Sequence, residues 1–347
     1  MSRNAFKYRA CGLLYGSDLQ HLDHIAPFCS ILGIPLVFTN VEIEALANQI
    51  YPHLETKLVS LNTLPETLIP DIEVIFSCLP TQLLEPIFSL SEHQFKKKLL
   101  FSWLPHGNSD KDNLGALIAE KHLMIYGKQM KDILQRHGVL EKVHQITTLG
   151  NFRKLYYFNN KRALDRVASP YTTFKREATM TLLYAPTWGD PDLASKAYTL
   201  INLLPEEYNL MVKFHPNTLY TGSAIALKEA FQDKENIKFI DDFPSIYPIL
   251  NHTEIYIGDH SSIAYDFLSF NSPLFFLTKG RTPIHHTGIV TKPQDLIEHI
   301  QNSVDLFSDA RQALNDYAFE PTPSLETIPQ LVEATIDQYF ETEPHVL

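Results

Sequence analysis

One loop of the sequence carries the residue types that acid–base chemistry requires. His106 and Asp110 lie in the segment 103–110, directly after an apolar run. An imidazole at that place could act as a general base, and the nearby carboxylate could orient it. Gly-Asn-Ser-Asp is also typical of a plain surface turn, so the sequence leaves both interpretations open.

A second segment, 255–268, has the pattern of an anion site. It reads as a short buried strand, a polar turn and a helix that opens on Ser261 and Ser262. The first turn of a helix presents unpaired backbone N–H groups and the positive end of a dipole, which suit a phosphate. Gly258 would let the chain turn tightly at the strand's end. An ordinary N-cap has the same sequence pattern.

Three more expected strands end in polar residues. Thr187 follows the strand 181–185 and offers a hydroxyl, and His215 precedes a proline, which favours an extended backbone. We expect His215 to contact a phosphoryl oxygen or a leaving group, although histidine before proline is more often structural. Asp242 could accept hydrogen bonds from ribose hydroxyls or a base, or be a solvated turn residue.

Other polar residues give weaker signals. His21 and His24 fit a solvated helix face better than any chemical role, and the pair His285-His286 has no third ligand nearby. The three cysteines show no metal spacing, and no zinc-binding motif is present, so we expect neither a metal nor a cofactor. G-x-G-x-x-G and G-x-x-x-x-G-K-[ST] are also absent, which argues against NAD enzymes and P-loop nucleotidases.

Short apolar strands alternate with helices along most of the chain, which predicts an α/β protein with mostly parallel sheets. The expected strands are 8–15, 34–38, 72–78, 98–103, 122–126, 143–148, 181–185, 210–214, 237–240, 254–257 and 273–277. They form two doubly wound, Rossmann-like halves facing each other across a cleft, with domains at 1–150 and 151–347. An amphipathic helix, 325–339, is expected to pack back at the end.

The length and the net charge of the chain limit the classes of function to consider. A chain of 347 residues favours two domains, and 44% hydrophobic with 20% charged residues indicates a folded protein. The net charge of −11 argues against nucleic-acid binding. No apolar run is long enough to span a bilayer, so we expect a cytoplasmic protein. Peripheral association with the inner face of the membrane is left open.

Four elements, taken in order, resemble the CDP-glycerol glycerophosphotransferase family of teichoic-acid polymerases and primases, which has a GT-B fold. These elements are His106-Gly107, Tyr184-Ala185-Pro186-Thr187, Phe214-His215-Pro216, and Asp259-His260-Ser261-Ser262 with Asp266-Phe267. The apolar strand 273–277 and the turn 150–153 also match the family's pattern. The resemblance covers residues 100–280 well and the first hundred only as a compatible α/β domain.

The resemblance implies a CDP-linked donor on the C-terminal domain. Its diphosphate would lie at Ser261 and Ser262, in the motif that Asp266 completes. His215 and Thr187 would contact phosphoryl groups, and Asp242 would approach the nucleoside.

His106 would take the proton from an acceptor hydroxyl, with no covalent intermediate and no metal. The acceptor would be lipid-linked or a glycan, as in the synthesis of a surface polymer. Three alternatives remain: a GT-B glycosyltransferase that uses a nucleotide sugar, a catalytically inactive nucleotide-binding homologue, and a nucleotide-sugar epimerase.

Overall fold

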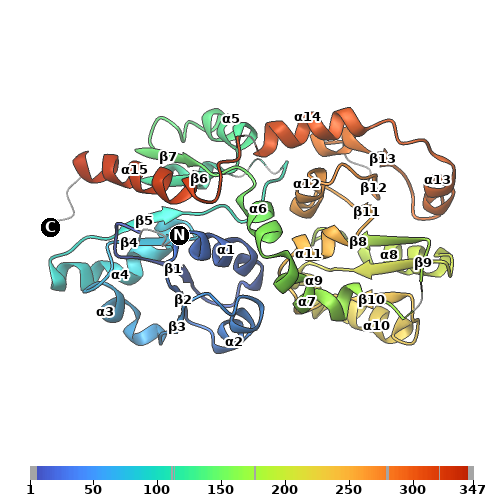
Figure 1. Ribbon diagram of the computed structural model, residues 1–347, viewed down its shortest axis with the longest axis horizontal. Coiled ribbons are helices and arrows are strands. Elements are labelled where there is room, and N and C mark those ends of the chain that lie inside the picture. Colours follow the sequence, from blue (N-terminus) through green and yellow to red (C-terminus); the bar gives the residue numbers. More distant parts are fainter. Residues whose placement is uncertain are drawn as a thin grey trace. The chain divides into compact units, whose positions relative to one another are not determined.

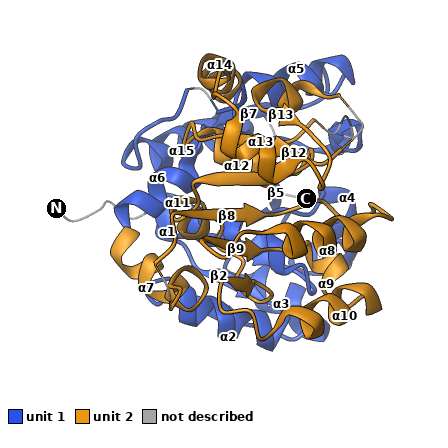
Figure 2. Cartoon of the chain, turned by 90° about the vertical axis from the view of Figure 1, so that its right-hand side faces the viewer, with its two compact units in different colours: residues 1–106, 112–160, 317–347 blue, residues 107–111, 161–316 orange. Residues whose placement is uncertain are grey.

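The computed structural model describes residues 6–110, 112, 114–175, 177–278, 281–319 and 321–342. The chain divides into two compact units, coloured separately in Figure 2. The first unit comprises the described residues within 1–106, 112–160 and 317–347, and the second those within 107–111 and 161–316. Each unit is built around one parallel sheet with helices on its faces (Figure 1).

The sheet of the first unit contains seven strands among the described residues, in the order β3-β2-β1-β4-β5-β6-β7. Each neighbouring pair runs parallel. The central strands are buried along their whole length, as strands covered by helices on both faces must be. The strands are β1 (Ala10–Leu14), β2 (Leu36–Phe38), β3 (Thr56–Leu58), β4 (Val74–Ser77), β5 (Leu100–Trp103), β6 (His122–Ile125) and β7 (Gln145–Thr148).

The helices of the first unit alternate with these strands, as crossover connections between parallel strands require. They are η1 (Leu19–His21), α1 (Leu22–Leu32), α2 (Val41–Ile50), η2 (Leu61–Thr63), α3 (Leu64–Leu68), α4 (Thr81–Phe95), η3 (Leu114–Ala119), α5 (Lys128–Arg136), α6 (Phe152–Asn159) and α15 (Thr327–Thr342). Asn40 caps α2 by accepting from the amides of Glu42 and Ile43.

The second unit has a parallel sheet of six strands among its described residues, in the order β10-β9-β8-β11-β12-β13. Numbered within its unit, this order is 3-2-1-4-5-6, the arrangement typical of doubly wound folds. The strands are β8 (Met180–Tyr184), β9 (Tyr208–Val212), β10 (Ile237–Phe239), β11 (Ile255–Gly258), β12 (Leu274–Phe276) and β13 (Ile289–Val290).

The helices of the second unit pack on this sheet over a core that includes Leu182, Leu210 and Ile257. They are α7 (Lys161–Thr172), α8 (Leu193–Leu203), α9 (Pro216–Leu219), α10 (Gly222–Phe231), α11 (Tyr247–Asn251), α12 (Ser262–Leu268), η4 (Pro283–Thr287), α13 (Leu296–Asn302) and α14 (Ser308–Phe319). Of α14, residues up to Asp316 belong to this unit.

All eleven expected strands are present, with ends within two residues of the prediction. Two edge strands, β3 and β13, were not predicted. Both are short, and β3 (Thr56–Leu58) is polar and largely exposed, so neither has the apolar run that identifies a buried strand. The polar stretch that begins the second unit, 161–172, forms the helix α7.

The compact units differ from the ranges expected from the sequence, because residues 151–160 and 317–342 count with the first unit. The last helix, α15, packs against the edge strand β7, where Thr147 and Thr335 share a hydrogen bond of 2.6 Å between their hydroxyls. The side chains of Lys7 and Tyr8 both contact Asp337 on the same helix. Contacts like these cannot be read from a pattern of local periodicity.

Gly150 explains why the chain can fold back here. Its φ is +59°, and a Cβ at this position would lie 2.3 Å from the Cα of Thr322. The amide of the next residue, Asn151, receives support from the same threonine, because it donates to Thr322 Oγ1 over 3.0 Å. Only glycine accommodates both the backbone conformation and this close approach.

Candidate functional site

The second unit has a polar site at the switch point of its sheet, between β8 and β11. In doubly wound folds this is where strand order reverses and where ligands bind. Thr187 follows β8 and is buried. Its backbone amide donates to both carboxylate oxygens of Asp259, at 3.1 and 2.9 Å. Asp259 follows β11, so one carboxylate ties together the two loops that flank the switch point.

The same carboxylate shapes the start of α12. Asp259 Oδ1 accepts from the amide of Ser261 at 3.0 Å, and Ser261 Oγ accepts from the amide of Ile263 at 3.3 Å. Two amides of this turn are therefore already engaged within the protein. The hydroxyl of Ser261 also hydrogen-bonds to Tyr256, and that of Ser262 lies at the first residue of α12, within the expected diphosphate site.

Burial raises the pKa of Asp259, and the amides of Thr187 and Ser261 and the nearby His260 oppose this effect. Burial also raises the pKa of Tyr184 and of Tyr256, with Asp259 as the next largest cause. These are the electrostatic conditions of a buried carboxylate held by hydrogen bonds rather than by a salt bridge.

Gly258 has a different role from the one predicted. It is not among the glycines with positive φ, so no left-handed turn requires it. A Cβ here would instead lie 2.3 Å from the hydroxyl oxygen of Tyr256, whose O–H donates to Ala185 O over 2.8 Å. Glycine leaves room for a tyrosine that joins β11 to the loop after β8.

His215 follows β9, the other neighbour of β8. It is the N-cap of α9, and its Nδ1 accepts from the amide of Asn217 over 3.2 Å. This bond places the proton of the neutral imidazole on Nε2, the nitrogen that could donate to a phosphoryl oxygen. The ring of Trp188, which is 52% exposed, lies 6.1 Å from the His215 ring between centroids.

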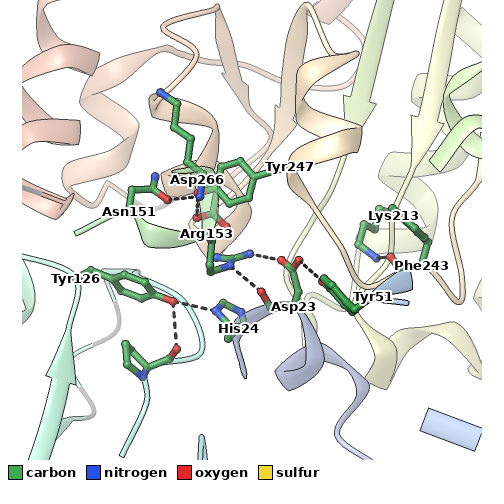
Figure 3. A network of polar contacts seen from close by, with 12 residues as sticks. Asp23, His24, Tyr51, Tyr126, Asn151, Arg153, Lys213, Phe243, Tyr247 and Asp266 are labelled. Carbon is green, nitrogen blue, oxygen red and sulfur yellow. Dashed lines mark hydrogen bonds and ion pairs between the residues drawn. The ribbon is translucent and has the colours of Figure 1, made fainter. Parts of the chain in front are cut away.

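Asp242 is exposed at the end of β10, the edge strand next to β9. The hydroxyl of Tyr171 on α7 donates to its carboxylate. The neighbouring Asp241 pairs with Lys228 at 2.6 Å. Lys213 reaches the same loop from β9 and donates to Phe243 O over 2.8 Å, as Figure 3 shows. The loop that carries Asp242 is thus fixed by contacts on both sides.

Two predicted site residues have structural partners instead of open positions. Asp110 lies within the second unit, where its carboxylate accepts from Tyr265, from Thr282 Oγ1 at 2.6 Å and from the amide of Ile284 at 3.2 Å. These bonds give no support to a role in orienting His106. Asp266 is buried and accepts from the hydroxyl of Tyr247 at 2.9 Å, so it fixes α12 against α11.

His106 belongs to the first unit, where it follows β5 and is exposed. Its ring lies 4.8 Å from that of His21 and 6.4 Å from that of Trp103, between centroids. The pKa of His21 is lowered to about 4, chiefly by burial and next by His106, while Asp18 opposes the shift. The two residues that the sequence placed on a solvated helix face, His21 and His24, are both buried.

A buried network extends from His24 toward the loop of His106 (Figure 3). The hydroxyl of Tyr126 donates to Pro105 O over 3.1 Å and lies 2.9 Å from His24 Nδ1. Beside it, Arg153 Nε donates to Asp23 O over 3.1 Å, and the guanidinium also pairs with the carboxylate of Asp23. Arg153 lies in the turn 150–153 that the sequence analysis noted. Its buried ion pair joins α6 to α1.

No group of three or more histidine, cysteine, aspartate or glutamate side chains suited to a metal occurs in the described part of the chain. Among the described residues, no helix is long and apolar enough to cross a membrane.

Comparison with known families bears on these sites. Residues 140–287, which contain Thr187, His215 and the turn 259–262, match the family described as CDP-glycerol:poly(glycerophosphate) glycerophosphotransferase. The matched segment is similar to that family and makes up less than half of the chain. The chain also resembles the teichoic acid glycerol-phosphate primase of Bacillus subtilis, with 29% identity over 169 residues. That match covers 45% of this chain and 39% of the primase, so the chain spans about two fifths of its curated relative.

Solved structures extend the likeness to the whole chain at the level of the fold. The wall teichoic acid polymerase TagF matches with a TM-score of 0.66 at 14% identity, over 99% of this chain and 92% of the polymerase. The UDP complex of Staphylococcus aureus MnaA matches with a TM-score of 0.62 at 12% identity, over 97% and 99%. The UDP-GlcNAc 2-epimerase of Neisseria meningitidis gives 0.58 at 11% identity, over 96% and 100%. The chain has the GT-B fold, and the fold alone does not separate a transferase from an epimerase.

The structure brings some predicted residues together through residues that were not predicted. Asp259 links Thr187 to Ser261, and it was quoted in the sequence pattern without being assigned to the site. The available signal was an aspartate two residues before a helix-capping serine, at the end of a buried strand. Tyr126 and Arg153 carried no such local signal.

Proposed function

We propose that the protein transfers a glycerophosphate-type group from a CDP-linked donor to an acceptor hydroxyl in the synthesis of a cell-surface polymer. The acceptor is a lipid-linked or glycan chain. The family match of residues 140–287 supports the reaction class. A variant of the TagF polymerase soaked with CDPG has the same fold, which supports a CDP-type donor.

The observation that carries the proposal is the bridge between Thr187 and Asp259. It gathers hydroxyls and amides at the switch point of the second unit, where doubly wound folds bind nucleotides. On this proposal the donor's diphosphate contacts the hydroxyls of Ser261 and Ser262 and the Nε2–H of His215. Asp242 contacts the ribose, and Asp266 holds α12 in place.

In the first unit, His106 is the proposed general base. Its exposed imidazole accepts the proton of the acceptor hydroxyl as that oxygen attacks the donor's β-phosphorus. A bond forms from the acceptor oxygen to phosphorus, the bond from phosphorus to the bridging oxygen breaks, and CMP leaves. Each side chain acts by position and charge, which is the main source of catalysis in phosphoryl transfer.

The experiment is a transfer assay with CDP-glycerol and a lipid-linked glycerophosphate acceptor, with CMP release as the measurement. His106→Gln is expected to lower the rate by about 10²–10⁴-fold, the usual effect of losing a general base. Wild-type rates in a folded His106→Gln protein would contradict the assignment. Thermal-shift titration should give stabilisation with CDP-glycerol and CMP; stabilisation by UDP-sugars alone, or turnover of UDP-GlcNAc without acceptor, would favour a glycosyltransferase or an epimerase.

The proposal includes peripheral attachment to a membrane, and helix α4 of the first unit supports it. Leu83 and Leu90 are 56% and 80% exposed and share one face of this helix, seven residues apart. Exposed lysines, Lys96 and Lys98, follow the helix end. Apolar side chains beside cations are the combination by which helices bind an anionic lipid surface.

Co-sedimentation with vesicles tests the attachment. Wild-type protein should bind phosphatidylglycerol vesicles more strongly than phosphatidylcholine vesicles, and the double variant Leu83→Ser/Leu90→Ser should bind less. The matched control is Val304→Ser/Leu306→Ser, because these residues of the second unit are at least as exposed, at 74% and 81%. Equal binding by both double variants would refute the assignment to α4.

A further inference from the structure

The loop that carries His106 is held from behind by a chain of buried hydrogen bonds. The hydroxyl of Tyr126, which follows β6, has one hydrogen and donates it to Pro105 O. It must therefore accept from His24 Nδ1, 2.9 Å away, which fixes the tautomer of that histidine. Burial lowers the pKa of His24, so it is neutral at pH 7. The sequence of contacts is His24, Tyr126, the carbonyl of Pro105, and then His106.

A second contact acts on the imidazole itself. The buried ring of His21 lies 4.8 Å from the His106 ring between centroids, at an interplanar angle of 50°. The ring of Trp103 lies 6.4 Å from the His106 ring between centroids, at an interplanar angle of 75°. His106 is exposed, yet two rings restrict the orientations that its side chain can adopt. An exposed side chain without such neighbours would lose rotamer entropy in reaching one reactive orientation.

His21 and His24 lie in neighbouring helical segments that are held in place by a buried ion pair. His21 ends η1 and His24 lies in the first turn of α1. The buried pair between Arg153 and Asp23 holds that turn to α6. The charged groups that face the cluster are therefore Asp18 before η1, Asp23 on α1 and Arg153 on α6.

We infer that Tyr126 and His21 are positioning residues for His106: Tyr126, held by His24, sets the backbone before it, and the His21 ring sets its imidazole orientation. The inference rests on the proposed function, because it takes His106 as the base. It adds a dedicated support, built from three elements of the first unit, that does not itself contact substrate. A displacement of about 1 Å in a reacting group can lower a rate by about 10²-fold, so such a support has a measurable effect.

Tyr126→Phe is the decisive variant. It keeps the ring, which stacks on Phe152 at 6.1 Å and 13°, and removes only the hydroxyl that links His24 to Pro105. We expect kcat to fall about 10-fold or more while KM for the donor stays unchanged. Tyr339→Phe is the matched control, because Tyr339 is a buried tyrosine of the same unit on α15, where its ring lies 6.1 Å from that of His144 between centroids. It should leave kcat near the wild-type value.

His21 is tested by a pair of variants. His21→Ala removes the aromatic ring beside His106 and should lower kcat. His21→Phe restores an aromatic ring there and should recover most of the lost kcat. An equal loss in both variants would show that the ring contact is not what matters and would overturn this part.

A double variant separates this inference from the proposed function. In a His106→Gln background, Tyr126→Phe should have no further effect on the residual rate, because there is no base left to position. A further drop by the same factor as in the wild type would mean that Tyr126 acts elsewhere and would overturn the inference. If His106→Gln alone kept wild-type activity, the proposed function would fail instead, and the two failures are distinct.

Discussion

The backbone amide of Thr187, after β8, donates to both carboxylate oxygens of Asp259, after β11. An aspartate therefore occupies the place where two strand-end loops meet, and its third bond, from the amide of Ser261, shapes the start of α12. The carboxylate therefore holds the two loops and the start of α12 together by hydrogen bonds within the protein.

Asp259→Asn should weaken donor binding. An asparagine side chain keeps one acceptor oxygen but turns an NH₂ toward the amides of Thr187 or Ser261, which leaves a buried donor unpaired at a cost of about 1–3 kcal/mol. We expect the Kd for CDP, measured calorimetrically, to rise about 10-fold or more. Asp233→Asn, at an exposed position of the same unit, is the control. An unchanged Kd in Asp259→Asn would contradict the bridging role.

Trp188→Ala should also weaken nucleotide binding. The indole is 52% exposed beside His215, and an exposed aromatic ring at a strand end offers a stacking surface for a base. Stacking of a base on an aromatic ring contributes about 1–3 kcal/mol, so the Kd for CDP should rise by about 10-fold. Glycerol phosphate, which has no base, should bind both proteins equally. Tyr220→Ala removes a ring that is 87% exposed in the same unit and should change neither affinity.

Glu120 predicts a pH dependence of stability in the first unit. The side chain is buried, and burial raises its pKa to about 7, although the amide and hydroxyl of Thr81, at 2.7 and 2.5 Å, oppose the shift. The folded protein therefore holds this proton at pH values where the unfolded chain, with a pKa near 4.5, has lost it. Stability from this group is full below pH 4.5 and is lost as pH rises through 7.

Urea denaturation at pH 5 and pH 8 measures this effect. A shift from 4.5 to about 7 corresponds to about 3 kcal/mol of unfolding free energy, at about 1.4 kcal/mol per unit. Glu120→Gln should remove that part of the difference between the two pH values, and Glu141→Gln, at an exposed position of the same unit, should keep it. Burial lowers the pKa of the His122 imidazole to about 3, so this group has the opposite effect on the pH dependence of unfolding. The stability that it contributes to the protein is lost as pH falls below 6.5. The comparison of variants cancels this contribution.

Much of the fold could be predicted from the sequence, because each buried parallel strand is a short apolar run that can be recognised from neighbouring residues alone. β3 was not predicted because its half-buried Thr56 and exposed Lys57 resemble loop residues in the sequence. The contact between α15 and β7 was not predicted, because it joins Thr335 to Thr147 across a large sequence separation. Periodicity carries no information about such contacts.

The candidate site likewise contains some residues that the sequence indicated and others that it did not. Strand-end polar residues such as Thr187 and His215 could be proposed from the sequence because a polar group directly after a buried strand is unusual, and their role stays a prediction. Asp110 looked like a partner of His106 because it is four residues away, but its carboxylate is bound by Thr282 and Ile284, far along the chain. His24 looked solvated because its burial depends on α6 and on Tyr126.

Gly258→Ala should destabilise the second unit through its effect on Tyr256. The added methyl group would lie 2.3 Å from the tyrosine hydroxyl oxygen and 2.6 Å from the ring carbon that bears it. Since Tyr256 is fully buried, the ring cannot move without breaking its bond to Ala185 O. Overpacking of this kind costs about 1–3 kcal/mol, and the unpaired carbonyl adds to it.

Because Ala185 lies two residues before Thr187, the damage should reach the proposed nucleotide site as well. We expect Gly258→Ala to lower the melting temperature and to weaken CDP binding, even when saturating nucleotide restores part of the stability. Gly222→Ala is the matched control, because a Cβ there meets nothing within 4 Å. That change, in the first turn of α10, should leave CDP affinity intact and the melting temperature equal or higher. A Gly258→Ala protein with wild-type stability would show that Tyr256 is free to move.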